Sequence, residues 1–250
     1  MYLTIRGLVT RVTAYNDTDA LLTVLSSEHG KLTVKARGLR RKNSPLTAPC
    51  QLLAYAEFTL FEYRGMYTVN EAHSIELFTG LRKDLFKLSL ATYFAQVCDV
   101  IAQEDIVNPQ LLSLILNSLF AMDKLNLSLS MVKAVFELRS ACIAGYTPYL
   151  DGCYSCGGVC PDRFNISEGR LECADCKATG DNSIRLPISS GVRDAMRYIA
   201  SCDDKHVFSF HVGEATAVDL SNITEAYLTR QLEQSFSTLD FYKSLYILDS

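Results

Sequence analysis

Polar and apolar residues alternate through the first third of the chain, in five short runs that turn residues separate. The runs span residues 3–13, 20–26, 31–37, 53–63 and 66–73, and they are rich in Val, Leu, Thr and aromatic side chains. Pairs such as His29-Gly30 and Arg64-Gly65 lie between them and favour turns. Five short strands over about 75 residues predict a small closed barrel of the OB-fold type.

The third run shows the alternation most clearly. Lys31, Lys35 and Arg37 fall on one face of the expected strand, whereas Leu32 and Val34 fall on the other. Successive side chains of a strand point to opposite faces. One face should therefore join the core of the barrel, and the other should form a cationic strip.

The fourth run places aromatic rings opposite its core face. Phe58 belongs to the apolar face, while Tyr55, Phe61 and Tyr63 fall on the other side together with Glu57. Exposed rings can stack on unpaired bases. Glu57 weakens that interpretation, and ordinary packing beneath helices explains the rings equally well, so both interpretations stay open.

From residue 81 onward the apolar spacing changes to that of helices. Leu81, Leu85 and Leu88 begin a row that continues to Ile101. Capping and helix-breaking residues predict further helices from Pro109 to about 124, from Ser128 or Ser130 to about 144, from Ser189 or Ser190 to about 201, and from Ser221 or Asn222 to about 245. Gly145 and Pro148 should end the third of these helices.

The chain of 250 residues has a formal net charge of −4, but its charges are segregated. Residues 1–56 carry eight Lys or Arg against three acids, whereas residues 187–250 carry five against nine.

We expect no signal peptide, because residues 1–7 lack a basic region followed by an apolar run. The longest uncharged stretch, 106–122, is too short and too polar for a membrane span. We therefore expect a cytoplasmic protein, whose nine cysteines serve as metal ligands and buried thiols.

Two Cys-x-x-Cys pairs organise the middle of the chain: Cys153 with Cys156, and Cys173 with Cys176. Each pair can present two thiolates from a tight turn, and two such turns complete a tetrahedral zinc site. Disulfides and unrelated buried thiols are the alternatives, and Cys160 is a fifth thiol between the pairs. Four thiolates leave no position for water, so we expect one structural Zn²⁺ ion rather than a catalytic one.

Six cations and no acid occupy residues 31–42. Flexible cations beside a barrel strand can follow a phosphate backbone without reading the bases. The alternative is that these cations only face solvent and bind no ligand. We predict that the DNA contacts are these six cations together with two on the first strand: Arg6, Arg11, Lys31, Lys35, Arg37, Arg40, Arg41 and Lys42.

Enzyme signatures are scarce in the sequence. The four histidines are far apart, and neither a phosphate-binding Gly-rich loop nor a nucleophile motif is present. The carboxylates of Asp17 and Asp19 are better explained by a turn between strands than by a metal site. We expect no catalytic residue.

Five further stretches stand out along the chain: KARGLRR at 35–41, FELR at 136–139, GYTPYL at 145–150, CYSCG at 153–157 and the ending KSL at 243–245. They resemble segments of the RecO family of bacterial recombination mediators. The order of a basic barrel, a helical middle and an embedded four-Cys segment also resembles that family. The resemblance covers essentially the whole chain.

This resemblance implies an α+β protein with an OB-fold DNA-binding domain at 1–80, a helical domain at 81–150 and 181–250, and a zinc-binding segment at 151–180. It implies a nucleoid-associated, non-enzymatic DNA repair protein that binds single- and double-stranded DNA and anneals complementary strands. With RecR, such a protein helps to load the recombinase onto strands coated by single-stranded DNA-binding protein, whose C-terminal tail it contacts. Candidate cations for that tail are Arg139, Arg193 and Arg197.

Two other classes of protein remain open. One is a zinc-stapled protein-interaction scaffold without direct DNA binding, in which the acidic helical end of the chain carries the function. The other is a metal-dependent enzyme that acts on nucleic acid. The full set of thiolate ligands and the lack of clustered carboxylates make the enzyme the weakest interpretation.

Overall fold

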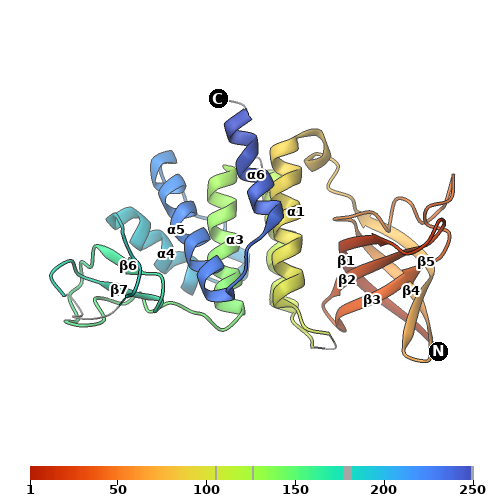
Figure 1. The fold of residues 1–250 in the computed structure, drawn as a ribbon, viewed down its shortest axis with the longest axis horizontal. Helices are drawn as coiled ribbons and strands as arrows, with labels where there is room; N and C mark the ends of the chain where they lie inside the picture. The colour runs from red at the N-terminus through yellow and green to blue at the C-terminus, as the bar shows by residue number, and fades with distance from the viewer. Residues whose placement is uncertain (105, 126, 177–181, 249–250) are drawn as a thin grey trace. The chain divides into compact units, whose positions relative to one another are not determined.

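The computed structural model describes residues 1–104, 106–125, 127–176 and 182–248, and they fall into two compact units (Figure 1). Unit 1 comprises residues 1–125 and 236–250, and unit 2 comprises residues 126–235. The helices of the described residues are each too short or too polar to cross a membrane.

Unit 1 begins with a closed barrel, as the alternation predicts. Its strands are β1 (Tyr2–Ala14), β2 (Ala20–Ser26), β3 (Gly30–Ala36), β4 (Tyr55–Tyr63) and β5 (Met66–Glu76). They close in the order β1-β2-β3-β5-β4, and the β3–β5 pair is parallel. Ile5, Leu22, Val34 and Phe58 are buried in the core of the barrel. The α+β fold with an OB-type barrel is therefore confirmed.

Three helices complete unit 1: α1 (Leu85–Ile101), α2 (Pro109–Asp123) and α6 (Ser237–Leu248). Asp84 caps α1 by accepting backbone N–H bonds, and Asn108 caps α2 in the same way. Tyr93 of α1 packs edge-on against Phe236, which directly precedes α6, with ring centroids 5.4 Å apart. The end of the chain thus returns to pack on α1 (Figure 1).

Unit 2 combines α3 (Leu129–Ile143), α4 (Ser190–Ser201) and α5 (Glu214–Leu232) with a sheet of three short strands, β6 (Arg163–Asn165), β7 (Arg170–Glu172) and β8 (Arg185–Pro187). Helix α3 ends where the sequence predicts. Gly145 is left-handed with φ 94°, and the Tyr146 N–H donates back to the Ala141 carbonyl at 2.8 Å. This is the glycine-terminated end that a Schellman motif provides.

The prediction for the last helix was wrong. A single helix from residue 221 or 222 to about 245 was expected, but α5 begins at Glu214 and ends at Leu232, and α6 follows from Ser237. Ser221 therefore lies inside α5 and does not cap a helix.

Neither boundary of α5 carries a strong sequence signal. Its N-cap is Gly213, which offers no side chain to cap the first turn. The helix ends because Glu233 adopts a left-handed backbone with φ 51°, a conformation in which glycine is the usual residue.

Helices α3 and α5 enclose a buried charge network. The Lys133 Nζ atom lies 2.9 Å from Glu137 Oε1 and 2.8 Å from Glu225 Oε2. The Thr224 hydroxyl donates to Glu137 Oε2 at 2.8 Å. Burial raises the pKa of Glu137, while the Lys133 ammonium opposes that rise. The network thus keeps buried charges paired where the two helices meet.

Candidate metal centre and nucleic-acid interface

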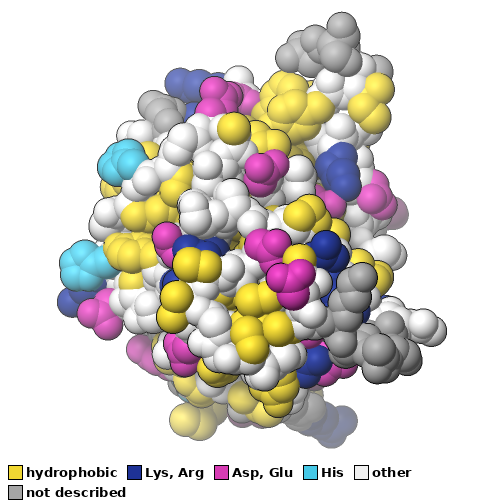
Figure 2. Space-filling view, turned by 90° about the vertical axis from the view of Figure 1, so that its left-hand side faces the viewer, with side chains coloured by type: hydrophobic (Ala, Val, Ile, Leu, Met, Phe, Trp, Pro, Cys, Tyr) yellow, Lys and Arg dark blue, Asp and Glu magenta, His cyan; other side chains and the backbone are white. Residues whose placement is uncertain are grey.

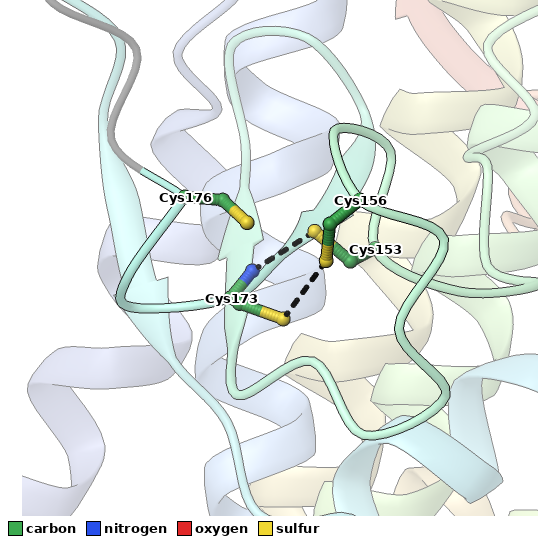
Figure 3. Close-up of side chains that lie close together, drawn as sticks. All are labelled: Cys153, Cys156, Cys173 and Cys176. Carbon is green, nitrogen blue, oxygen red and sulfur yellow. Dashed lines mark hydrogen bonds between the residues drawn. The ribbon is translucent and has the colours of Figure 1, made fainter.

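Four thiols of unit 2 converge on one point (Figure 3), and the sulfur atoms of Cys153, Cys156, Cys173 and Cys176 all lie within 4.8 Å of one another. The Cys156 and Cys173 sulfurs are 3.9 Å apart. Four thiolates about 2.3 Å from a zinc ion form a tetrahedron with edges of about 3.8 Å, whereas a disulfide bond is about 2.05 Å long. The spacing therefore fits a metal ion and not a disulfide. Cys160, the fifth thiol, is exposed and lies outside the cluster.

Two glycines shape the first Cys-x-x-Cys turn. Gly157 has φ 70° and donates its N–H to the Cys153 carbonyl at 2.8 Å. A Cβ atom on Gly158 would lie 3.2 Å from the Cys156 sulfur and 3.6 Å from the Cys173 sulfur. Glycine at these two positions lets the chain turn tightly and pass close to the thiols.

Backbone N–H groups favour a thiolate at Cys153. Burial works against that charge, but hydrogen bonds from the N–H groups of Cys156, Cys173 and Ser155 lower the pKa of Cys153 to about 6. The hydrogen bond with the Cys153 sulfur raises the pKa of Cys173 to about 12, and the one with the Cys156 sulfur raises the pKa of Cys176 to about 11. Four thiolates would repel one another strongly, so this donor set fits a divalent cation placed among them.

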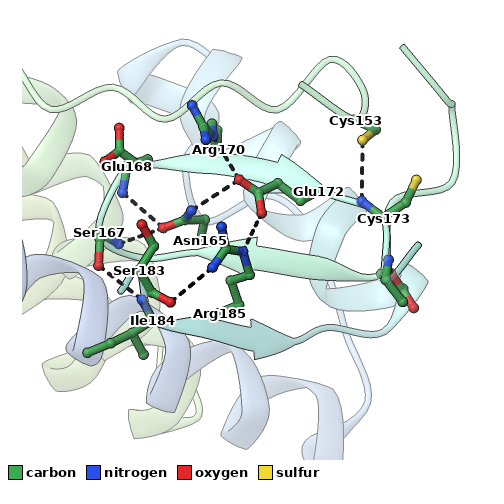
Figure 4. A network of polar contacts seen from close by, with 12 residues as sticks. Cys153, Asn165, Ser167, Glu168, Arg170, Glu172, Cys173, Ser183, Ile184 and Arg185 are labelled. Carbon is green, nitrogen blue, oxygen red and sulfur yellow. Dashed lines mark hydrogen bonds and ion pairs between the residues drawn. The ribbon is translucent and has the colours of Figure 1, made fainter. Parts of the chain in front are cut away.

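A buried carboxylate holds the small sheet together behind the thiols (Figure 4). Glu172 of β7 is buried, and it accepts hydrogen bonds from Arg170 Nε at 2.8 Å and from Arg185 Nε at 2.6 Å. The amide of Asn165 donates to it at 3.0 Å. Burial opposes ionisation of Glu172, but the two guanidiniums hold its pKa below the ordinary value. Because Cys173 follows directly, this network fixes one ligand-bearing turn to a rigid strand.

The predicted zinc-binding segment at 151–180 lies within unit 2, although residues 177–180 fall outside the residues that the structure describes. The three short strands behind the thiols were not predicted individually. With three residues each they are too short to show a period.

Strand β3 and the loop after it carry the predicted cationic strip. Leu32 and Val34 are buried in β3, while Lys31 and Lys35 on its other face are partly exposed. The cations of the following loop are all exposed: Arg37, Arg40, Arg41 and Lys42. The alternation predicted for this strand is therefore confirmed.

Five of the eight candidate DNA contacts have a partner inside unit 1. The pairs are Arg6 Nε with Glu57 Oε2 at 2.9 Å, Arg11 Nη2 with Asp99 Oδ2 at 2.7 Å, Lys31 Nζ with the Asp99 carbonyl at 3.0 Å, Lys35 Nζ with Asp19 Oδ2 at 3.2 Å, and Arg40 Nη1 with the Asn16 carbonyl at 2.6 Å. The side chains of Arg37, Arg41 and Lys42 make neither a hydrogen bond nor an ion pair with described residues. These three cations are the ones most open to an anionic ligand.

Asp19 anchors the basic loop, a role that sequence reasoning missed. Its Oδ1 atom accepts the Gly38 N–H at 2.9 Å, and its Oδ2 atom pairs with Lys35. The Arg40 N–H donates to the neighbouring Thr18 carbonyl at 2.9 Å. The Gly38 hydrogen bond, helped by Lys35, holds the pKa of Asp19 far below its ordinary value. Its position in a polar turn between strands was the available signal, and that turn is confirmed.

The three arginines proposed for a partner peptide all contact unit 2 itself. Arg139 pairs with Asp204 and donates to backbone carbonyls at the end of α4. Arg197 Nε donates to the Leu150 carbonyl at 2.6 Å, and Arg193 Nε lies 3.2 Å from the carboxylate of its neighbour in the chain. Their role in binding a partner stays a prediction.

Charges are mixed on the face of the molecule that Figure 2 shows. Lys and Arg side chains lie beside Asp and Glu, with hydrophobic side chains between them. Mixed charge attracts a polyanion less than a stretch of one sign does. The acid-free stretch 31–42 is therefore the better candidate for nucleic acid.

Comparisons with known proteins cover nearly the whole chain. The family described as Recombination protein O N terminal matches residues 1–78, and the one described as Recombination protein O C terminal matches residues 82–240. A DNA repair protein RecO from Acetivibrio thermocellus is 33% identical over 246 residues, which cover 98% of this chain and 97% of the relative. Its counterpart from Alkaliphilus metalliredigens is 30% identical over 248 residues, covering 98% and 100%. A third, from Symbiobacterium thermophilum, is 26% identical over 244 residues, covering 96% of each.

Proposed function

This chain belongs to the RecO family of DNA repair proteins, and we propose from this that it is a non-enzymatic recombination mediator that binds single- and double-stranded DNA. It anneals complementary strands and, together with RecR, helps to load the recombinase onto strands coated by single-stranded DNA-binding protein. The DNA contacts belong to the barrel domain at 1–80. The helical domain at 81–150 and 181–250, with its zinc-binding segment at 151–180, binds the protein partners.

The observation that carries DNA binding is the acid-free stretch 31–42 on β3 and the loop after it. Arg37, Arg41 and Lys42 are exposed there without a partner among described residues. Asp19 and its hydrogen bond with Gly38 hold that loop in place. Cations on a held loop contact phosphates without reading sequence, which suits a protein that must bind any strand.

A salt titration of single-strand binding tests this function. The variant Arg41→Gln/Lys42→Gln removes two free cations, so the slope of log K against log salt should become shallower by about 1.4 units. Affinity should fall alike for all sequences, and annealing should fall with it. Lys205→Gln/Arg230→Gln is the matched control, because it removes the same charge from exposed positions of unit 2.

The opposite result would favour the scaffold interpretation. If the folded Arg41→Gln/Lys42→Gln protein keeps its affinity and its salt slope, these cations are only solvated. If the wild-type protein binds neither single strands nor duplex at low salt, direct DNA binding is excluded.

Zinc is the metal that we propose for the four-thiol cluster. Four thiolates at this spacing are typical of a structural zinc site, and the bound ion would link the two Cys-x-x-Cys turns by coordinating both. Four protein ligands leave no position for a water molecule, which supports a function without catalysis. Homogeneous protein should therefore hydrolyse neither DNA nor nucleotides.

The tail of single-stranded DNA-binding protein is the proposed peptide partner of the helices. An apolar groove of about 250 Å³ between α1 and α6 is lined by Leu85, Leu88 and Phe241, among others. Leu85 and Phe241 are exposed there. An apolar side chain of the peptide can enter such a groove while acidic residues of the peptide meet a cation.

Calorimetry with the tail peptide can separate the two candidate places. Loss of binding in Leu85→Ser/Phe241→Ala would place the peptide in the α1–α6 groove, and loss in Arg193→Gln/Arg197→Gln would place it on unit 2. Arg230→Gln is the control for charge. A wild-type protein that does not bind the peptide would exclude this partner.

A further inference from the structure

An exposed aromatic groove lies on the barrel, and its rings have no role in the phosphate contacts proposed above. It has a volume of about 380 Å³, and Tyr2, Phe61, Tyr63 and Met66 line it together with Arg37. These four apolar side chains are between 40% and 67% exposed. A contiguous apolar patch on the surface of a soluble protein usually marks an interaction site.

Strand pairing gathers these rings from two elements. Tyr2 of β1 lies opposite Phe61 of β4, and their ring centroids are 5.4 Å apart at an interplanar angle of 54°. Tyr63 lies opposite Met66 across the β4–β5 hairpin. Cross-strand pairs of this kind hold their side chains at a fixed spacing, so the groove is preformed.

A tight two-residue turn forms the tip of this hairpin. Arg64 and Gly65 connect β4 to β5, and both are left-handed, with φ 53° and 75°. A two-residue loop with this geometry matches the twist of its strands. The Arg64 guanidinium lies 5.2 Å from the centroid of the Tyr63 ring, so a cation borders the aromatic patch.

The charge around the groove favours an anionic ligand. Arg37 lines the groove, and its side chain has no partner among described residues. The other polar lining residues are Thr68 and Asn70, and the described residues that line the groove include no acid. Glu57, the acid that shares the outer face of β4, is paired with Arg6.

The geometry points to this groove as a base-stacking site for single-stranded nucleic acid, with unpaired bases against Phe61 and Tyr63 and a phosphate at Arg37. A single strand carries planar apolar bases and phosphate charges together, which is the combination that the groove offers. A duplex keeps its bases stacked inside, so it can reach only the cations. The groove thus gives the barrel a preference for single strands over duplex. This inference rests on the proposed DNA-binding function.

Removal of one ring tests the site. Phe61→Ala should weaken binding of a short oligo(dT) by about 5- to 150-fold, the loss expected when one aromatic platform for a base is truncated. Duplex affinity and the salt slope should not change, because the phosphate contacts remain. Phe61→Leu keeps apolar bulk beside Tyr2 and should lose the same affinity, which separates stacking from a defect in folding. Phe120→Ala is the control, since Phe120 is a similarly exposed phenylalanine on α2.

The absence of tryptophan from the chain permits a direct reporter. The single tryptophan of Tyr63→Trp should be quenched by oligo(dT), whereas an oligonucleotide of the same length built from abasic sites should bind weakly and leave the emission unchanged. The inference is overturned if oligo(dT) binds without quenching and Phe61→Ala binds like the wild type; the proposed function then still stands. It is also overturned if only a peptide partner quenches the reporter. If no nucleic acid binds at all, both proposals fail.

Discussion

Individual acidic side chains pair with cations of the barrel and so determine how many of those cations remain available to an anionic ligand. Asp99 holds Arg11 through its carboxylate and Lys31 through its carbonyl, while Asp19 holds Lys35. These contacts fix the strands to their surroundings and reduce the charge that β3 presents. Both carboxylates are buried, and a buried charge left without its partner destabilises a protein more than a broken surface pair does, so these contacts matter for stability as well as for position.

The carboxylate of Asp19 should make the stability of the barrel sensitive to acid. Its pKa is lowered in the folded protein by the Gly38 hydrogen bond and by Lys35. Its contribution is therefore complete above the unfolded pKa of about 3.9 and is lost as the pH falls below that value. Urea unfolding between pH 7 and pH 3 should show a shallower loss of stability on acidification in Asp19→Asn than in the wild type.

Asp17→Asn provides the control for that measurement. Asp17 is exposed in the same turn. Its replacement should leave the pH dependence close to that of the wild type. Identical acid profiles for Asp19→Asn and the wild type would show that Asp19 does not anchor the loop through its charge.

The strands and most helices follow from local patterns, because each is long enough to show a period or a cap. The β3 alternation predicted which residues are buried, and Pro109 marked the start of α2. The Cys-x-x-Cys spacing identified four thiols that the structure brings together. In each case the signal is contained in a short stretch of sequence, which is a strand, a helix start or a Cys-x-x-Cys pair.

Other features could not be predicted, either because they join residues far apart in the chain or because the residue at the position does not favour the observed backbone. Asp99 meets Arg11 and Lys31 only after the barrel has packed on α1. The break after α5 depends on a left-handed Glu233, a residue that usually continues a helix. The aromatic groove needs Tyr2 and Phe61 from strands that are distant in sequence.

The glycine that ends α3 gives a clean test of backbone conformation. Gly145 has φ 94°, and no atom lies within 4 Å of a Cβ placed there. Gly145→Ala should therefore destabilise unit 2 by about 1–2 kcal/mol through backbone strain alone. Gly213→Ala is the matched control: its φ is −63° and its Cβ also meets no atom. It loses the N-cap preference for glycine over alanine, but the lower entropy of the unfolded chain offsets that loss, so its cost should be smaller. Equal urea midpoints for the two variants would contradict this account of the helix end.

The division into two units has a consequence for metal loss. Unit 2 is one continuous stretch, whereas unit 1 is completed by α6, which the chain forms after leaving unit 2. The four thiols and the small sheet belong to unit 2, and the barrel belongs to unit 1. Damage at the metal centre should therefore remain local.

Removal of the metal should unfold the proposed zinc-binding segment and spare the barrel. Structural zinc contributes ~10–16 kcal/mol of folding free energy at neutral pH, more than three strands of three residues each can replace. After chelation, or in Cys176→Ser, hydrogen exchange should show lost protection across 153–176 and unchanged protection in β1 to β5.

Metal analysis of the wild type should find one zinc ion per chain, and Cys160→Ser should retain it, because Cys160 lies outside the cluster. Loss of zinc from Cys160→Ser would show that the ligand set is wrong. Equal loss of protection in the barrel would show that the two units do not fold separately.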